Sequence, residues 1–381
     1  MSPDVDFDAV VVGGGPVGLF LGCRLARRGL SFLVLEQREA PPPHSRAIGI
    51  HPPALELLGR LGLADRMVAR GVLIRGALVR GERGVLGELE FSGVSPYPFI
   101  LALPQRDTET LLEARLHELR PGTLRRGVSV VDVDDGTSHA TVTYRDNAGE
   151  VHQVRARFVV GADGHRSLVR QLAGIAYPGR PYQDRYLMGD FEDTTTYGAT
   201  AVIHVTQGGV VEAFPLPHGK RRWVVRSEPG LREGAEDLCR LIHTRTGLHV
   251  PASTCSMLSP FGVGRHLATR FVKGRVVLVG DAAHEVSPIG GQGMNLGLLD
   301  AAALAGALEQ EVRGEGSSRS PLLAYQRQRR RGARVAARQA EFNMFFGRPV
   351  RTPGPRERVL RVMLARPLRP LLARLFTMRW L

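Results

Sequence analysis

The chain has 381 residues, of which 43% are hydrophobic and 23% charged, with a formal net charge of +14. This composition allows one large or two moderate domains with a substantial core, and it excludes a disordered chain, a collagen and a disulfide-stabilised scaffold. Residues 321–381 hold 15 arginines and two acidic residues, whereas the first 320 residues carry a net charge of only +1. The positive charge therefore belongs to one C-terminal segment. Because no recognised nucleic-acid-binding module accompanies it, the sequence predicts no nucleic-acid partner.

The predicted elements alternate between two patterns along the chain. Residues 8–35 are typical of a strand–helix–strand unit, followed by a helical region at 53–63, β structure at 72–103 with turns at Gly76, Gly81, Gly84 and Gly87, a helix at about 107–119 and a β-meander at 128–160. Residues 199–216 and 222–226 alternate as half-exposed antiparallel strands do, and a helix at about 233–246 and a strand near 257–264 follow. A buried strand at 275–279, a long helix at about 294–309 and basic helices within 321–381 complete the chain.

The first strand and helix are joined by a glycine-rich turn, Gly13-x-Gly15-Pro16-x-Gly18, and the next strand ends at Glu36. In this pattern the first glycine permits a tight turn, the second lets backbone approach a pyrophosphate, and the third allows the helix to pack closely on the strand. The acid can accept hydrogen bonds from ribose hydroxyls, and the helix N-terminus faces the phosphates. The motif predicts a dinucleotide site, and alone it leaves FAD and NAD undecided.

A second motif, RVVLVGDAAHEVSPIGGQGMNLGLLDA, occupies residues 275–301. Its strand brings Asp281 to the carboxyl end, where an acid can bind a polyol such as the ribityl chain of a flavin. The loop that starts at Pro288 leads into a helix whose first amides can stabilise negative charge, such as that of a reduced flavin. An acidic cap on an ordinary loop is the alternative for this motif alone. Together the two motifs favour FAD.

The fold that these patterns predict is α/β: a Rossmann-like FAD-binding domain with a mixed or parallel sheet and a β-meander, interrupted by an antiparallel-sheet substrate domain and followed by C-terminal helices. We assign residues 1–75, 100–175 and 265–320 to the FAD-binding domain. Residues 76–99 and 176–264 form the substrate domain, and residues 321–381 form the basic helical segment.

With VVGADGHRSLVR at 159–170, the motifs resemble those of the FAD-dependent aromatic hydroxylases, the p-hydroxybenzoate hydroxylase-like single-component flavin monooxygenases, over residues 5 to about 310. The resemblance implies FAD as cofactor and NADH or NADPH as co-substrate. It also implies that dioxygen hydroxylates an aromatic or polyketide-like small molecule through a flavin C4a-hydroperoxide. The competing interpretations are a flavin reductase or dehydrogenase of the same fold without oxygen insertion, and a non-catalytic FAD-bound scaffold.

The resemblance also implies individual cofactor contacts. Asp163 and Gly164 match the motif that helps place the flavin and nicotinamide pyrophosphates, and Arg46 resembles an arginine that reaches the flavin phosphates or the pyridine nucleotide. Gln105 resembles a flavin-contacting glutamine, with a simple helix-start residue as the alternative. Arg166 and Arg170 could each contact phosphate, but the favoured expectation for each is a surface charge or an ion pair. The predicted cofactor-binding set is Gly13, Gly15, Pro16, Gly18, Glu36, Arg46, Gln105, Asp163, Gly164, Asp281, Pro288, Gly291, Gly293, Met294 and Asn295.

No side chain is assigned as catalytic, because the chemistry is centred on the flavin. A base for a phenolic substrate is sought among His204, His218, Tyr182 and Tyr186, each of which is more often structural. The three cysteines form neither a C-x-x-C pair nor a metal-ligand spacing, so no metal site is predicted.

The chain carries no recognisable signal peptide and no apolar run of about 18 residues, so we expect a cytoplasmic protein. The basic tail is expected either to pack its apolar side on the body or, as the sharper hypothesis, to make a weak peripheral contact with anionic lipid. The sequence predicts no particular oligomeric state.

Overall fold

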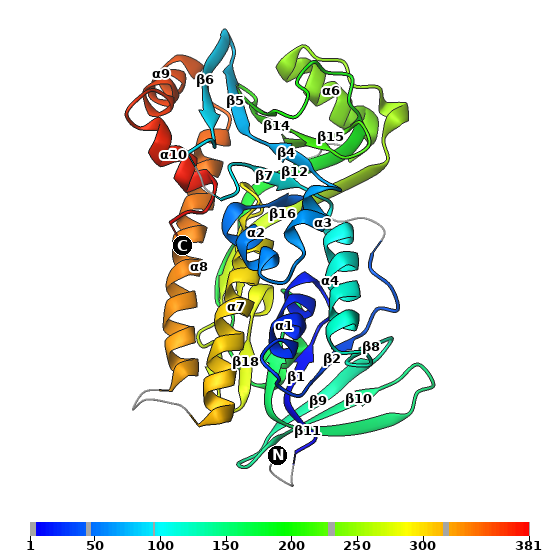
Figure 1. Cartoon of the computed structure of the whole chain (residues 1–381). Coiled ribbons are helices and arrows are strands. Elements are labelled where there is room, and N and C mark those ends of the chain that lie inside the picture. Colours follow the sequence, from blue (N-terminus) through cyan, green and yellow to red (C-terminus); the bar gives the residue numbers. More distant parts are fainter. Residues whose placement is uncertain (1–4, 43–46, 94–95, 228–232, 315–319, 381) are drawn as a thin grey trace.

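The structure is a computed structural model that describes residues 5–42, 47–93, 96–227, 233–314 and 320–380 (Figure 1). The strands in these ranges form two eight-stranded sheets and a small three-stranded sheet. The predicted α/β class, with an antiparallel sheet and C-terminal helices added to a parallel one, is confirmed.

The first sheet is built around parallel strands. Its order is β17-β18-β11-β1-β2-β8, and β10 and β9 extend it from β11. Strands β1 (Phe7–Val12) and β2 (Phe32–Glu36) are buried over most of their length, as expected of continuous apolar runs covered on both faces. Helices α1 (Pro16–Ala26), α4 (Gln105–Leu119) and α7 (Gln292–Arg313) lie along this sheet (Figure 1). Its other strands are β8 (Leu124–Arg126), β9 (Ser129–Asp135), β10 (Ala140–Arg145), β11 (Val151–Gly161), β17 (Val272–Lys273) and β18 (Val276–Leu278).

The second sheet is mainly antiparallel, in the order β19-β16-β12-β15-β14-β13-β5-β6. Its strands are β5 (Gly76–Gly81), β6 (Gly84–Glu90), β12 (Gly179–Glu192), β13 (Ala201–Thr206), β14 (Gly209–Leu216), β15 (Lys220–Ser227), β16 (Met257–Leu267) and β19 (His284–Glu285). The hairpin β5–β6 joins this sheet because β5 pairs in parallel with β13. Helix α6 (Ala235–Thr246) covers one face through buried Leu238 and Ile242.

Short elements connect the two sheets. Strands β3 (Gly49–Ile50), β7 (Ile100–Ala102) and β4 (Val72–Ile74) form the three-stranded sheet. Helices α2 (Pro52–Gly59) and α3 (Ala64–Val68) follow β3, and α5 (Leu168–Leu172) follows β11. None of the described helices is long and apolar enough to cross a membrane.

Two of the predicted turns in the region 72–103 are wrong. Gly76 and Gly87 lie inside strands, and the hairpin turns between Gly81 and Gly84. A Cβ on Gly76 would lie 2.4 Å from the carbonyl oxygen of Leu89 on the paired strand, and one on Gly87 would lie 2.7 Å from Leu364 Cβ. These glycines therefore admit close neighbours and do not mark turns. The sequence reading also missed β12, which pairs with both β15 and β16.

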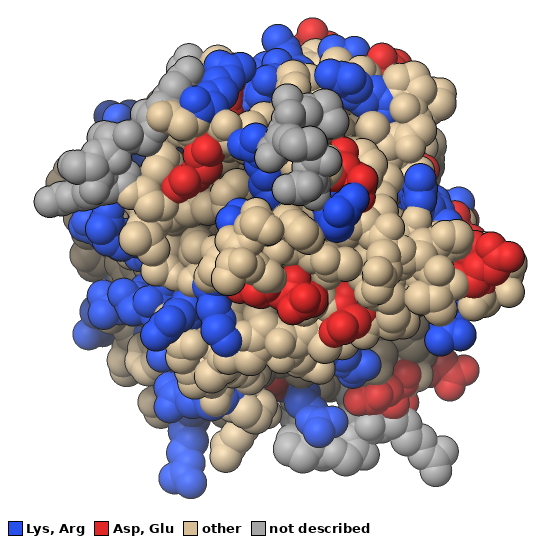
Figure 2. Space-filling view, turned by 90° about the horizontal axis from the view of Figure 1, so that it is seen from below, with Lys and Arg blue, Asp and Glu red and all other residues tan. Residues whose placement is uncertain are grey.

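The basic C-terminal segment is helical and packs on the rest of the molecule. Helix α8 (Pro321–Gly347) runs beside α7, and α9 (Pro353–Leu364) and α10 (Arg369–Phe376) lie near β6 (Figure 1). Leu364 and Ala373 are buried in one cluster with Leu86 and Leu89 of β6. These two residues therefore pack on the body, whereas Val359, Leu368 and Leu371 of the same segment are exposed. Figure 2 shows basic side chains gathered toward the left of the face seen from below, whereas acidic side chains lie mainly over its centre and right.

Candidate functional site

The parallel sheet brings the three sequence motifs to one edge. Val12 of β1 is paired with Gly161 of β11, and Gly161 is paired with Leu278 of β18, all in parallel. The loops that follow these strands therefore leave the sheet side by side at its carboxyl edge. In open α/β sheets this edge is where ligands bind.

The glycine-rich turn has two structural glycines and one that faces open space. Gly13 has a φ of +109°, and a Cβ there would lie 2.4 Å from the carbonyl oxygen of Ala162. A Cβ on Gly18 would lie 1.9 Å from the carbonyl oxygen of Gly13. At Gly15 the nearest such atom is Arg38 Nη2 at 4.0 Å. The turn thus leaves room for a group to approach the backbone at the start of α1, as a pyrophosphate requires.

Glu36, at the end of β2, lies directly beside this turn. Its Oε2 accepts a hydrogen bond from the Gly14 amide at 2.6 Å, and its Oε1 accepts hydrogen bonds from the amide and Nε of Arg38, both at 2.9 Å. Burial alone would raise the pKa of this carboxyl, but the hydrogen bonds from Arg38 and Gly14 lower it. Glu36 is therefore held as an anion, which suits acceptance of ribose hydroxyl bonds. The sequence reading missed Arg38, whose only signal is its position two residues after Glu36.

Asp163 and Gly164 follow β11 at the same edge. The Asp163 carboxylate accepts a hydrogen bond from Ser167 Oγ at 2.5 Å and one from the Val169 amide at 3.1 Å, and burial raises its pKa. Its side chain therefore organises the start of α5. This position at the edge is compatible with the predicted cofactor role, which stays a prediction.

Two arginines flank this loop and one of them was misjudged. Arg166 is exposed, as expected. The expectation for Arg170 is wrong, because it is 5% exposed and donates hydrogen bonds to the carbonyl oxygens of Ala282 at 3.0 Å and His165 at 2.8 Å. Arg170 thus ties the loop after β11 to the loop after β18. Arg46, the third predicted arginine, lies outside the described residues.

The Asp281 side chain reaches solvent but has protein atoms packed around it. Its side chain is exposed, but the surrounding protein desolvates the carboxyl enough to raise its pKa. Its backbone carbonyl accepts a hydrogen bond from Tyr177 Oη at 2.8 Å. An accessible acid with such surroundings is available to a ligand that displaces water, as a polyol chain does.

The loop that precedes α7 is held by an amide side chain. Asn295 Nδ2 donates to the carbonyl oxygens of Gly49 at 2.8 Å and Gly291 at 2.9 Å, and its Oδ1 accepts a hydrogen bond from the His51 amide at 2.8 Å. Asn295 therefore positions the loop and has its amide hydrogen bonds already used. Pro288, Gly291, Gly293 and Met294 remain at least partly accessible on this loop. They are the members of the predicted flavin-edge set that can face a ligand.

Gln105 begins α4 and contacts another side chain. Its side-chain Nε2 donates a hydrogen bond to Glu109 Oε1 at 2.7 Å, and its backbone amide donates one to the carbonyl oxygen of Ala47 at 3.0 Å. Glu109 is 1% exposed, and burial raises its pKa. The structure thus gives Gln105 a local partner, and its contact with a flavin stays a prediction.

The second sheet turns one face toward the flavin-edge loop. A buried apolar cluster joins Tyr186, Met188 and Val224 of the sheet to Ile289 of that loop and Met344 of α8. Glu212 of β14 lies directly opposite Ile203, which packs against the same cluster. Within the described part of the chain, Glu212 forms no hydrogen bond or ion pair, and burial raises its pKa to about 7. The sequence reading missed it, although an acid at an inward position of an alternating strand is a usable signal.

Of the four residues considered as a base, only Tyr186 combines a place on this face with a free hydroxyl. Its Oη is buried without a hydrogen-bond partner, and burial together with the charge of Glu212 raises its pKa. His204 follows Val202 by two residues and so shares the face covered by α6, where it contacts Tyr197 Oη at 3.3 Å. His218 is exposed in a turn, and Tyr182 Oη donates to Glu341 at 2.5 Å.

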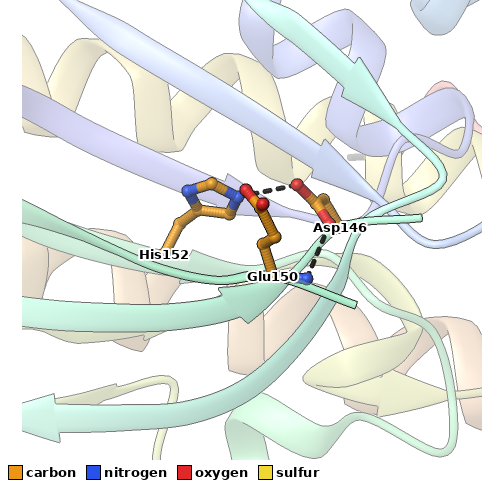
Figure 3. A group of neighbouring side chains, drawn as sticks. All are labelled: Asp146, Glu150 and His152. Atoms are coloured by element: carbon orange, nitrogen blue, oxygen red, sulfur yellow. Dashed lines mark hydrogen bonds and ion pairs between the residues drawn. The ribbon is translucent and has the colours of Figure 1, made fainter. Parts of the chain in front are cut away.

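One group of potential metal ligands occurs among the described residues: Asp146, Glu150 and His152 in the β10–β11 turn (Figure 3). Asp146 Oδ1 accepts hydrogen bonds from the amides of Ala148 and Glu150, and Oδ2 contacts His152 Nε2 at 2.7 Å. These contacts close the turn at the start of β11, whereas the residues at the sheet edge follow the other end of that strand. We therefore assign the group a structural role in the hairpin.

Comparison with known proteins places the chain in a wider context. Residues 6–340 match a family described as FAD binding domain. The uncharacterised aromatic compound monooxygenase YhjG of Bacillus subtilis is 36% identical over 324 residues, which cover 82% of this chain and 63% of that protein. A rifampicin monooxygenase of Streptomyces venezuelae is 37% identical over 322 residues, or 81% of this chain and 65% of that protein. The chain thus spans slightly less than two thirds of the length of these curated relatives.

Among solved structures, p-nitrophenol 4-monooxygenase PnpA from Pseudomonas putida DLL-E4 superposes with a TM-score of 0.88. It is 27% identical, and the match covers 98% of this chain and 97% of that one. The likeness therefore extends over both sheets and the C-terminal helices.

Proposed function

Since this chain belongs to the FAD-binding domain family, we propose that it is an FAD-dependent monooxygenase that uses NADH or NADPH and dioxygen to hydroxylate an aromatic or polyketide-like small molecule. The observation that carries the proposal is the meeting of the glycine-rich turn, Glu36 and the Asp281 loop at one carboxyl edge of the parallel sheet. The names of the relatives, which are monooxygenases of aromatic compounds, rifampicin and p-nitrophenol, support the reaction class.

The predicted cofactor residues would contact different parts of FAD. The amides at Gly15 and the start of α1 would hold the pyrophosphate. Glu36 would accept hydrogen bonds from the adenosine ribose hydroxyls, and Asp281 would accept them from the ribityl hydroxyls. The amides that begin α7, after Gly291, stabilise negative charge at the pyrimidine edge of the flavin. Bound FAD would supply electron transfer from NADH or NADPH and the activation of dioxygen.

The chain's own part in the reaction is to orient the substrate and to accept its proton. We place the aromatic substrate between the flavin-edge loop and the face of the second sheet that carries Tyr186 and Glu212. A carboxylate with a pKa of about 7 is half ionised near neutral pH and can accept a phenolic proton. The unpartnered Tyr186 hydroxyl can donate to an oxygen of the substrate.

The test combines a spectrum with isotope labelling. Purified chain reconstituted with FAD should show a bound-flavin absorbance, and phenols or polyketides should stimulate oxidation of NADH or NADPH. With ¹⁸O₂ present, the label should appear in the product. Protein that cannot bind FAD would refute the cofactor assignment. Stimulated oxidation without label in any product would favour the reductase of the same fold.

The C-terminal segment supports a second, peripheral role. Val362 and Leu371 are 61% and 67% exposed, and exposed Arg358, Arg361 and Arg366 are close to them in the sequence. Apolar and basic side chains together favour the surface of an anionic bilayer. We therefore propose a weak membrane contact through α9 and α10.

Co-sedimentation with vesicles that contain phosphatidylserine tests this contact. The double variant Val362→Ser and Leu371→Ser should sediment less than the wild type. The variant Val151→Ser, which changes an exposed valine of β11, should sediment as the wild type does. Equal sedimentation of all three proteins would exclude the membrane contact.

A further inference from the structure

A cavity of about 590 Å³ lies between α8 and the strands β12, β16 and β19. On α8 it is lined by Arg330, Ala333, Arg334, Ala337 and Arg338. The spacing of four residues puts the three arginines on one side of the helix, and the two short alanines leave room beside them. The volume is in the range of sites that hold small molecules. None of the predicted FAD-binding residues that the structure describes lines this cavity.

The cavity is strongly and unequally charged. Arg180 of β12 and Arg265 of β16 join the three arginines of α8, and the described lining contains no acidic residue. Arg265 is paired with Glu341 at 3.2 Å. In the described part of the chain, Arg330, Arg334, Arg338 and Arg180 form no ion pair. The Cζ atom of Arg180 lies 5.7 Å from the centroid of the Tyr182 ring. Arg180, Arg265, Arg334 and Arg338 are exposed and Arg330 is half-buried. Among the described residues, four of these five guanidinium groups form no ion pair.

Two polar atoms of the lining are buried without partners. Arg330 Nε and His284 Nδ1 are both inaccessible and form no hydrogen bond, and His284 is 1% exposed. The fold thus buries polar groups beside the cavity without pairing them, as it does at the Nε atoms of several other arginines. By contrast, the neighbouring Arg329 is paired with buried Asp300. The fold therefore compensates one arginine of α8 and leaves the next one uncompensated.

The positive charges also act on one another. Burial, and then the nearby charge of Arg334, lower the pKa of Arg330. A bound anion would relieve this repulsion and supply acceptors for the guanidinium N–H groups of the exposed Arg334 and Arg338. Guanidinium groups form paired hydrogen bonds with phosphate oxygens, so a cluster of them suits a phosphate better than a single point charge would.

We propose that this cavity is a binding site for a small molecule that carries two or more linked phosphates. Two sources offer that chemistry: the diphosphate of NADH or NADPH, and a free anion such as pyrophosphate. The cavity adjoins His284 and Val286, which lie between Asp281 and the flavin-edge loop, and this proximity favours the dinucleotide. The anion site stands on the arginines alone, and only its assignment to NADH or NADPH rests on the proposed function.

Calorimetric titration of the FAD-loaded chain with inorganic pyrophosphate tests the site at low ionic strength. The cavity variant carries Arg334→Gln and Arg338→Gln. The matched control carries Arg327→Gln and Arg331→Gln, which remove two exposed charges from the same helix outside the lining. Because hydrogen bonds to charged groups are strong, the affinity of the cavity variant for pyrophosphate should fall by about tenfold or more. The control should bind within about twofold of the wild type.

Absence of pyrophosphate binding to the wild type, or equal losses in both variants, would overturn the proposal. Circular dichroism checks that both variants fold, and a second variant with Arg334→Lys and Arg338→Lys should recover part of the affinity, since the charge returns without the planar fork. Steady-state kinetics then identifies the source. A KM for NADPH that rises more than kcat falls in the cavity variant supports the dinucleotide, and an unchanged KM with lost pyrophosphate binding supports a separate anion. If no oxygenation occurs with any substrate, the calorimetric result still decides the site.

Discussion

Replacement of Glu212 by Gln removes a carboxyl group whose ionisation the folded protein opposes. Burial raises the pKa of Glu212 from the usual 4.5 to about 7. With about 1.4 kcal/mol for each pKa unit, the ionised form costs the folded state on the order of 3 kcal/mol. This value is an upper estimate, because the side chain keeps some contact with solvent.

The sign of the pH dependence follows from the bound proton. Between pH 4.5 and about 7 the folded state keeps a proton that the unfolded state has lost. The free energy of unfolding therefore falls as the pH rises through this interval, and the contribution of Glu212 is constant above it. Glu212→Gln has no such proton, so its stability relative to the wild type should rise by up to about 3 kcal/mol from acidic to alkaline pH.

Urea unfolding at a series of pH values measures this difference. The variant Glu88→Gln, which changes an exposed glutamate on β6 of the same sheet, is the control and should parallel the wild type. The pH profile of kcat/KM for a phenolic substrate is the second measurement. Loss of the base should lower kcat/KM about 100-fold where the substrate is protonated.

Two outcomes would refute the reasoning on Glu212. Identical pH slopes of stability in wild type and Glu212→Gln would mean that the folded protein does not oppose ionisation. An unchanged pH profile of kcat/KM would mean that Glu212 does not accept the substrate proton, whatever its effect on stability.

Three further predictions concern the sheet edge and the core. Gly18→Ala should lose about 3 kcal/mol or more of unfolding free energy in urea, because the added Cβ would lie 1.9 Å from the Gly13 carbonyl oxygen. The control Gly306→Ala, at an open position within α7, should gain about 0.5–1 kcal/mol. Similar effects at both glycines would contradict the close packing at Gly18. Gly15→Val should leave the melting temperature of the apoprotein unchanged and weaken FAD binding on the order of tenfold in a fluorescence titration, since the side chain would enter the space beside the turn; unchanged affinity would place the pyrophosphate elsewhere. Asp300→Asn should cost about 3–5 kcal/mol of unfolding free energy, because it leaves Arg329 buried beside His284 without a counter-charge; a loss below about 1 kcal/mol would show that water solvates the arginine.

The parts of the fold with a local signal could be predicted from the sequence. The continuous apolar runs of β1 and β2 and the glycines between them identify a strand–turn–helix unit, because sterics at Gly13 and Gly18 admit few alternatives. The predicted helices at 107–119 and 233–246 correspond to α4 and α6. Boundaries and turns were less certain, as Gly76 and Gly87 show: whether a glycine turns the chain or admits a neighbour depends on elements far away in the sequence.

The sequence by itself determined the fold class and the family, because the alternation of strands and helices and the glycine-rich motifs are local features that can be recognised without knowing how the chain packs. Only the tertiary structure decided what individual polar side chains do. Arg170 binds backbone carbonyls, Asn295 holds a loop, and Glu212 is desolvated, because each depends on residues at least a hundred positions away or on the strands that pack around it. The arginines of α8 show the same dependence: Arg330, Arg334 and Arg338 line one cavity with Arg180 and Arg265 only because β12 and β16 pack beside this helix.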